Sequence, residues 1–148
     1  MSELITESLY CQISDKLLKE IDLSKLPLYG EYEYYKITAE RYGKVKIKLD
    51  IEKDIDKIKY VESLNSKRLS SQNYYTYEWE VEEKKLPKVY EPLIRPEIMR
   101  FIEIFSIFNK NKNVILKFSV VDGDYKTSEK YAYELAVRYA LIELFNQI

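Results

Sequence analysis

The sequence predicts an α+β fold: one domain over residues 1–148, with a mostly antiparallel sheet of about four strands. An N-terminal helix, a middle helix and a long C-terminal helix are expected to pack on that sheet. Three observations lead to this prediction. Apolar residues recur with helical spacing near both ends of the chain, alternate with polar residues in two central stretches, and form an almost unbroken run over residues 114–121. At 148 residues, one domain of this kind buries about two-thirds of its unfolded surface.

The first predicted element is a helix over residues 3–22. Its apolar side chains recur every three or four residues, as on one face of a helix. They are Leu4, Ile5, Leu9, Ile13, Leu17, Leu18 and Ile21. Pro27 and Gly30 follow this stretch and are expected to end the helix.

A β-hairpin is predicted next, from Glu31 through Ile51, with Gly43 at the turn. In its second strand, the aliphatic residues Val45, Ile47 and Leu49 alternate with three lysines. Period-2 geometry therefore places Lys44, Lys46 and Lys48 on the opposite face. The lysine row has two interpretations. It either guards an edge strand against aggregation, which we prefer, or contacts phosphates of a nucleic acid.

Residues 53–65 suit a short helix with Asp54 as its cap, and the stretch YYTYEWEVEEKK that follows them alternates again. One face of this third strand carries Tyr75, Tyr77, Trp79 and Val81. The other face carries Tyr74, Thr76, Glu78, Glu80 and Glu82. Such alternation is typical of a half-buried strand, so we expect the first group to face the core.

The last third of the chain predicts three elements: a segment after Pro96 that suits a helix better than a strand, then a strand, and then a helix. Pro96 suits the first turn of the middle helix, residues 114–121 suit a buried strand, and residues 122–124 suit a turn. The final helix is expected over residues 127–147. Its core side is predicted to carry Ala132, Leu135, Ala136, Tyr139, Ala140 and Leu144.

Composition excludes several classes of function. The chain has no histidine, which removes histidine-based triads and His-ligated zinc, and its single cysteine, Cys11, removes an internal disulfide. Three glycines are too few for a phosphate-binding glycine loop, and a net charge of −1 gives no bulk attraction for nucleic acid. No apolar run approaches the ~20 residues that span a bilayer. We therefore expect a cytoplasmic protein without a cofactor and without a membrane partner.

Three residues suggest a nuclease as one alternative. Asp50 ends a predicted strand, and Glu82 and Lys84 have the spacing Glu-x-Lys near the end of another, before a helix and an apolar strand. This order resembles the PD-(D/E)xK nuclease family. The resemblance implies that Asp50 and Glu82 bind Mg²⁺, that Lys84 positions the attacking water, and that Glu20 on the first helix is an accessory acid.

A second alternative comes from the last predicted helix, within SEKYAYELAVRYALIELF. It resembles the final helix of the double-stranded-RNA-binding domain. The residues in register are Ser128, Lys130, Ala132, Ala136, Ala140, Leu141 and Leu144. The resemblance implies phosphate contacts from the start of this helix. Alanines every four residues also suit a helix that lies close on a sheet.

The preferred hypothesis rests on tyrosine, of which the chain has 15. Tyrosine buries a large area and keeps a hydroxyl for hydrogen bonding, so it is favoured at interfaces. We therefore predict a non-enzymatic interaction protein that forms a homodimer or binds a protein partner. The predicted contact residues are Tyr32, Tyr34, Tyr35, Tyr74, Tyr75 and Tyr77. The low glycine content and the many Lys, Glu, Ile and Tyr residues give the chain a composition that resembles that of small accessory or regulatory proteins of hyperthermophilic archaea and their viruses.

Overall fold

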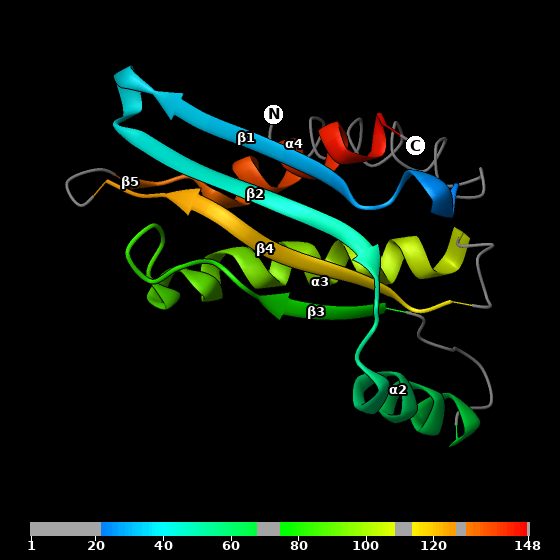
Figure 1. Cartoon of the computed structure of the whole chain (residues 1–148). Coiled ribbons are helices and arrows are strands. Elements are labelled where there is room, and N and C mark those ends of the chain that lie inside the picture. Colours follow the sequence, from blue (N-terminus) through cyan, green and yellow to red (C-terminus); the bar gives the residue numbers. More distant parts are fainter. Residues whose placement is uncertain (1–21, 68–74, 109–113, 127–129, 148) are drawn as a thin grey trace.

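The structure is a computed structural model that describes residues 22–67, 75–108, 114–126 and 130–147. These residues form one α+β body, in which a sheet carries two helices on one face (Figure 1). The expected helix over residues 3–22 lies outside the described residues, apart from Asp22. Asp22 caps a short 3₁₀ turn, η1 (Leu23–Lys25), through a hydrogen bond from the Ser24 amide to its carboxylate. Among the described residues, no helix is both long and apolar enough to cross a membrane.

The sheet is mixed, which corrects the prediction of a mostly antiparallel one. Its order is β1-β2-β4-β3, with the short β5 paired to β2. β1 with β2 and β2 with β4 are antiparallel, whereas β3 with β4 and β2 with β5 are parallel. A helix separates β3 from β4 and returns the chain to the same end of the sheet, and such a crossover produces parallel neighbours. The strands are β1 (Leu28–Lys36), β2 (Arg41–Ile51), β3 (Tyr75–Trp79), β4 (Leu116–Asp124) and β5 (Lys130–Tyr131).

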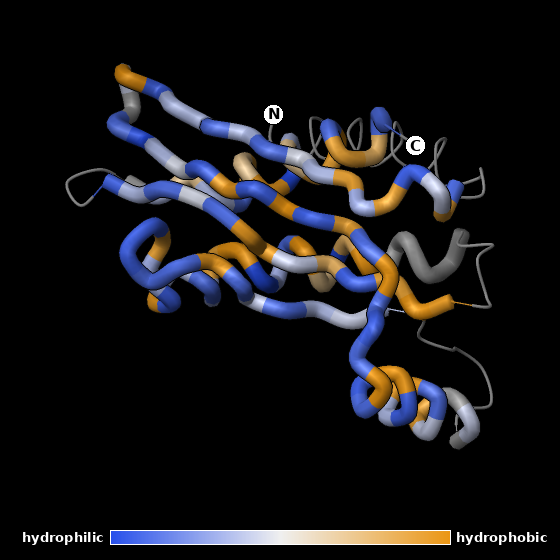
Figure 2. The backbone as a smooth tube through the Cα atoms, viewed as in Figure 1, coloured by the Kyte–Doolittle hydropathy of each residue, from blue (hydrophilic) through white to orange (hydrophobic). Residues whose placement is uncertain are grey.

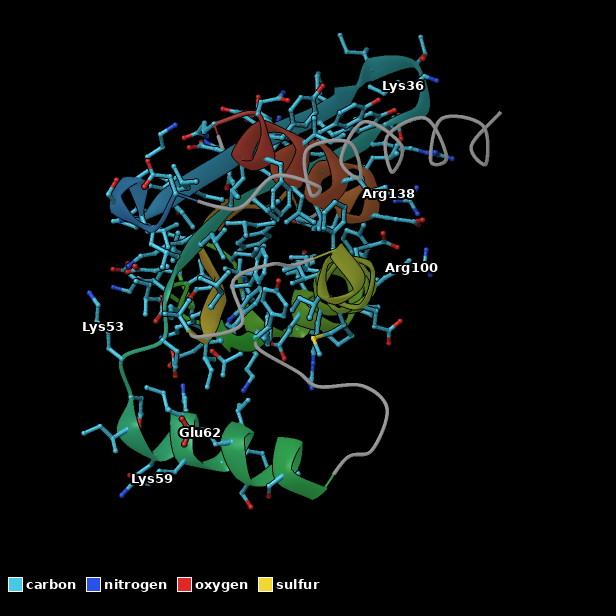
Figure 3. All side chains as sticks on the ribbon, turned by 90° about the vertical axis from the view of Figure 1, so that its right-hand side faces the viewer. Lys36, Lys53, Lys59, Glu62, Arg100 and Arg138 are labelled. Carbon is cyan, nitrogen blue, oxygen red and sulfur yellow. The ribbon has the colours of Figure 1, made fainter. Side chains whose placement is uncertain are left out.

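The described part of the chain contains three α-helices, and their order differs from the prediction. They are α2 (Ile55–Lys67), α3 (Glu91–Phe108) and α4 (Tyr133–Phe145). All three follow the hairpin, and α3 and α4 pack on one face of the sheet and against each other (Figures 1 and 3). α2 lies beyond the β3 edge instead. Asp54 caps α2 as expected, because its carboxylate accepts the Asp56 amide at 3.0 Å.

The hairpin forms as predicted, but its turn lies elsewhere. β1 and β2 are joined by a 3₁₀ turn, η2 (Ile37–Ala39), and by Glu40, whose φ of 51° is left-handed. Gly43 lies inside β2, opposite Tyr34. A Cβ atom on Gly43 would come within 2.9 Å of the Ala132 carbonyl group, so this glycine permits a close backbone approach instead of a turn.

β2 shows the predicted alternation, which Figure 2 displays as changing hydropathy along the strand. Val45, Ile47 and Leu49 are fully buried, while the lysines between them are half-buried on the opposite face. However, β2 lies between β1 and β4, so it is not an edge strand. The preferred interpretation of the lysine row as an edge guard is therefore wrong.

β3 and β4 place their apolar residues as predicted. In β3, Tyr75 is buried and Tyr77 and Trp79 pack against the core. β4 occupies the centre of the sheet and is buried at Leu116, Phe118 and Val120, which the apolar run predicted. It continues through Asp124, so residues 122–124 pair with β2 and do not turn the chain.

The two packed helices begin at other residues than predicted. α3 begins at Glu91, directly after a 3₁₀ turn, η3 (Lys88–Tyr90), so Pro96 lies inside the helix and not in its first turn. α4 begins at Tyr133 and not at residue 127. Ala136, Ala140 and Leu144 are buried as expected. Leu135 and Tyr139 are only half-buried, because Val137 and Leu141 take the core side where α4 meets both the sheet and α3.

Candidate functional site

The sheet face opposite α3 and α4 has no described helix lying across it (Figures 1 and 3). We call it the outer face. The strand registers and the alternation of burial define its residues. They are Tyr29, Glu31, Glu33 and Tyr35 of β1; Tyr42, Lys44, Lys46, Lys48 and Asp50 of β2; Lys117, Ser119, Asp122 and Asp124 of β4; and Thr76 and Glu78 of β3.

Charges of opposite sign alternate across the outer face. The lysine row of β2 lies between Glu31 and Glu33 of β1 on one side and two aspartates of β4 on the other. Lys44 Nζ lies 3.4 Å from Glu31 Oε1, and this hydrogen-bonded pairing raises the pKa of the lysine. The lysine row is therefore largely compensated by carboxylates, unlike a basic stripe that binds phosphates.

Five of the six tyrosines predicted to contact a partner are described by the structure, and only one of these five lies on the outer face. Tyr35 does, and its side chain is 48% exposed. Tyr32 and Tyr34 point to the helix side of β1. Tyr32 stacks on Tyr139 of α4 with ring centroids 4.7 Å apart, and Tyr34 packs against the core.

The three predicted tyrosines around β3 are less accessible or not described. Tyr75 is 3% exposed and thus has no surface for a partner. Tyr77 is half-buried, and its hydroxyl donates to Glu91 Oε2 at 3.1 Å. Tyr74 lies outside the described residues. The sequence interpretation missed Tyr29, which is 40% exposed on the outer face. Tyr29 is separated from Glu31, Glu33 and Tyr35 by even numbers of residues, so the alternation of a strand could have placed it on the same face as they are.

Tyr42 organises one end of the outer face. Its hydroxyl lies 3.1 Å from Glu33 Oε2 and 3.0 Å from Asp124 Oδ2, and burial, together with these carboxylates, raises its pKa. The Lys126 ammonium sits 4.6 Å from the ring centroids of both Tyr42 and Tyr35. These contacts hold the Tyr35 ring beside a cation, at the surface.

A pocket of about 300 Å³ lies at the other end of the outer face, beside α2. It forms where β2 leaves the sheet and where the side chains of β3 and β4 meet the start of α2. Its walls carry four lysines and five carboxylates. The lining residues are Lys48, Asp50, Ile51, Glu52, Lys53, Asp54, Lys57, Glu78, Glu80, Lys117 and Ser119.

Lys117 is the centre of an ion-pair network in this pocket. Its ammonium contacts Glu78 and lies 3.0 Å from Glu80 Oε1, while Lys57 Nζ lies 3.2 Å from Glu78 Oε2. Burial alone would lower the pKa of Lys117, but its hydrogen bonds to the two glutamates outweigh burial and raise it. The hydrogen bond from Lys117 likewise lowers the pKa of Glu78.

Glu52 lies at the bottom of this network. Its side chain is 1% exposed, and its Oε1 atom is buried without a hydrogen-bond partner. Lys57 Nζ and Lys117 Nζ each lie 4.0 Å from one of its oxygens, beyond hydrogen-bonding distance. The backbone fixes the residue in place, because the Glu52 amide donates to the Ile115 carbonyl at 2.8 Å.

The residues that resemble a nuclease site are not brought together. Asp50 lines the pocket and is level with Lys117 and Thr76 across the sheet. Glu82 and Lys84 do not line this pocket. β3 ends at Trp79, so Glu82 and Lys84 are exposed in the turn beyond it. Glu20 lies outside the described residues, which contain no group of three or more metal-ligating side chains placed to hold an ion.

The start of α4 also differs from the helix that resembles an RNA-binding domain. The helix begins with Tyr133 and Glu134, and Lys130 precedes it in β5. Ser128 lies outside the described residues. The alanines Ala136 and Ala140 are fully buried, as expected for a helix lying close on a sheet.

Comparisons with known proteins add no functional assignment. No protein-family model matches the chain, and no curated protein matches its sequence.

Proposed function

We propose that this protein is a non-enzymatic interaction protein, with an accessory or regulatory role, that binds through its tyrosine-bearing outer face. A second copy of the same chain is the partner that the surface suits best. The observation that supports this proposal most directly is that Tyr29 and Tyr35 are exposed on a sheet face with no described helix across it.

The spacing of these two tyrosines supports a contact along β1. They are six residues apart on the same face, which separates them by about 20 Å. Each ring already lies near a cation, Lys46 at 5.0 Å from the Tyr29 centroid and Lys126 at 4.6 Å from the Tyr35 centroid. Rings held in this way lose little further side-chain entropy on binding, which favours them as anchors.

The order of charges makes the outer face complementary to itself. Glu31 pairs with Lys46 across the hairpin, and Glu33 pairs with Lys44. A two-fold axis that runs parallel to the strands, midway between β1 and β2, would set each glutamate of one copy over the corresponding lysine of the other. Such matching fixes the register between partners. The net charge of −1 gives little repulsion between copies.

Multi-angle light scattering on the purified protein tests this proposal. We expect the mass of a dimer for the wild type, and of a monomer for the Tyr29→Ser/Tyr35→Ser double variant at the same concentration. Tyr60→Ser is the matched control, because Tyr60 is 65% exposed on α2, off the sheet. It should behave like the wild type. Circular dichroism should show that all three proteins are folded.

Two results would contradict the proposal. One is a strictly monomeric wild type that also captures no protein from its native extract. The other is a double variant that assembles as the wild type does. If the wild type is monomeric but captures a protein through Tyr29 and Tyr35, the surface is correct and the partner is a different chain.

A further inference from the structure

We propose that the pocket beside α2 is a binding site for a primary ammonium group, carried either by a small free amine or by a lysine side chain. The inference rests on the buried carboxylate of Glu52 and is independent of the tyrosine contact. It assigns to this pocket an organic cation with N–H donors.

The Glu52 carboxylate has an unmet requirement for hydrogen-bond donors. A buried carboxylate is costly unless donors reach it, and its Oε1 has none. The two nearest ammonium groups, of Lys57 and Lys117, stay at 4.0 Å because both donate to Glu78. A donor that reached Oε1 from the pocket would complete the coordination of Glu52.

The charges around Glu52 favour a cation over an anion. Within the network, the two lysines face three glutamates, namely Glu52, Glu78 and Glu80, so one negative charge is left over. An anionic ligand would meet this surplus, whereas an ammonium neutralises it. An ammonium also brings three N–H donors, so it can reach Glu52 and a neighbouring acceptor together.

The pocket has room for such a group and for the chain that carries it. Its volume of about 300 Å³ is at the lower end of the range for small-molecule sites. Ile51 contributes an apolar patch to a lining that is otherwise polar. An alkyl chain can lie against Ile51 while its ammonium group points to Glu52. Lysine side chains pack in the same way, with the methylene groups on an apolar surface and the ammonium group in a polar environment.

The test is an NMR titration of the carboxyl carbons of the full chain, in phosphate buffer so that no buffer amine competes. The two probes are n-butylammonium chloride and Nα-acetyl-lysine amide, and 1-butanol serves as the neutral ligand of similar shape. We expect saturable binding of at least one amine, with a shift of the Glu52 carboxyl carbon, and no saturation by 1-butanol. Binding of the lysine derivative alone points to a protein side chain, and binding of n-butylammonium alone points to a free amine.

The matched variants are Glu52→Gln and Glu62→Gln. Glu52→Gln keeps the shape but removes the charge, and should weaken amine binding about tenfold or more, as losing a hydrogen bond to a charged group does. Glu62 is exposed on α2 and does not line the pocket, so its variant should bind as the wild type does. Neither the amines nor Glu52→Gln should alter the mass in light scattering, so this inference can fail while the proposed function holds.

Four results would overturn the inference: no saturable response to either amine, an equal response to 1-butanol, unchanged affinity in Glu52→Gln, or a response to MgCl₂ but to neither amine. If Glu52→Gln does not fold, the wild-type titration decides alone. In that case, an amine that saturates without moving the Glu52 carboxyl carbon contradicts the assignment.

Discussion

Glu97 and Arg138 form a buried ion pair that joins α3 and α4. Arg138 Nε of α4 donates to Glu97 Oε2 of α3 at 3.0 Å, and both residues are almost fully buried. Glu134, one turn earlier on α4, also contacts the guanidinium. Figure 3 labels Arg138 on α4 above α3, with Arg100 on α3 below it. The pair therefore fixes how the two helices meet.

Replacing Glu97 with alanine should be strongly destabilising, because it removes the buried carboxylate that the Arg138 guanidinium contacts on α3. We expect a loss of about 3–5 kcal/mol in the free energy of unfolding, measured by urea denaturation. Arg100→Ala is the control. Arg100 also reaches Glu97, at 3.6 Å, but it is exposed, so its loss should cost about 1 kcal/mol or less. Equal effects from the two variants would show that the buried pair does not hold the helices together.

At the residue scale, the sequence predicted burial in β2 and β3 correctly, but it could not assign the faces of the tyrosines in β1. In β2, aliphatic residues alternate with charged ones, so the face on which each residue lies is unambiguous. In β1, tyrosines lie on both faces of the strand. Which of these faces meets the core depends on α4, which packs over Gly30. Asp50 was recognised as a candidate acid and does line the pocket. Glu52 and Lys117 were missed, because only the strand order brings them together.

At the element scale, α4 lies unusually close to the first strand. A Cβ atom on Gly30 of β1 would lie 1.9 Å from the Ala140 carbonyl oxygen and 2.8 Å from the Leu144 Cβ atom. Both neighbours are buried residues of α4, so neither can move away easily. The close contact therefore requires glycine on the strand.

Gly30→Ala should therefore force α4 away from the sheet. We expect a loss of about 1–3 kcal/mol or more in stability, as overpacking of a core contact produces. Lys36→Ala, an exposed change at the other end of β1, should alter stability by no more than about 0.5 kcal/mol. Thermal melting monitored by circular dichroism compares the two. A Gly30→Ala protein that melts like the wild type would mean that α4 is not docked on β1.

Most elements were predictable from the sequence, while their arrangement was not. The hairpin, the buried strand and the amphipathic helices are local patterns that repeat over five or more residues. The pairing of β3 with β4 is non-local, since α3 lies between them in the chain. No local periodicity records which strands become neighbours. The parallel β3–β4 edge follows from that pairing, the interior place of β2 follows from its own non-local pairing with β4, and the pocket depends on both.

At the scale of the whole molecule, buried tyrosine hydroxyls make the stability of the fold decrease at alkaline pH. Burial raises the pKa values of Tyr42, Tyr75, Tyr77 and Tyr133 above the ordinary value for tyrosine. An unfolded tyrosine ionises near pH ~10. Because the folded state holds these protons more tightly, their contribution to stability is complete below that pH and declines as the pH rises above it.

We therefore expect the protein to unfold cooperatively above about pH 10, as the unfolded tyrosines become able to ionise. The measurement is absorbance at 295 nm, which reports tyrosinate, followed together with circular dichroism. The Tyr42→Phe variant is the control, since it removes one of the four groups and should make the alkaline loss less steep. Ionisation of all tyrosines while the circular dichroism stays native would contradict the assigned burial.

The outer face is the surface on which the functional account depends, and chemical labelling of tyrosine tests it most directly. The purified protein is modified with N-acetylimidazole at high and at low protein concentration, and the rate at each tyrosine is measured by peptide mass spectrometry. We predict that Tyr29 and Tyr35 are modified several-fold more slowly in the concentrated, assembled protein, while exposed Tyr60 on α2 reacts equally fast in both. An assembled protein in which Tyr29 and Tyr35 react as fast as in the dilute sample, or in which Tyr60 is protected instead, would contradict the outer face as the site of contact.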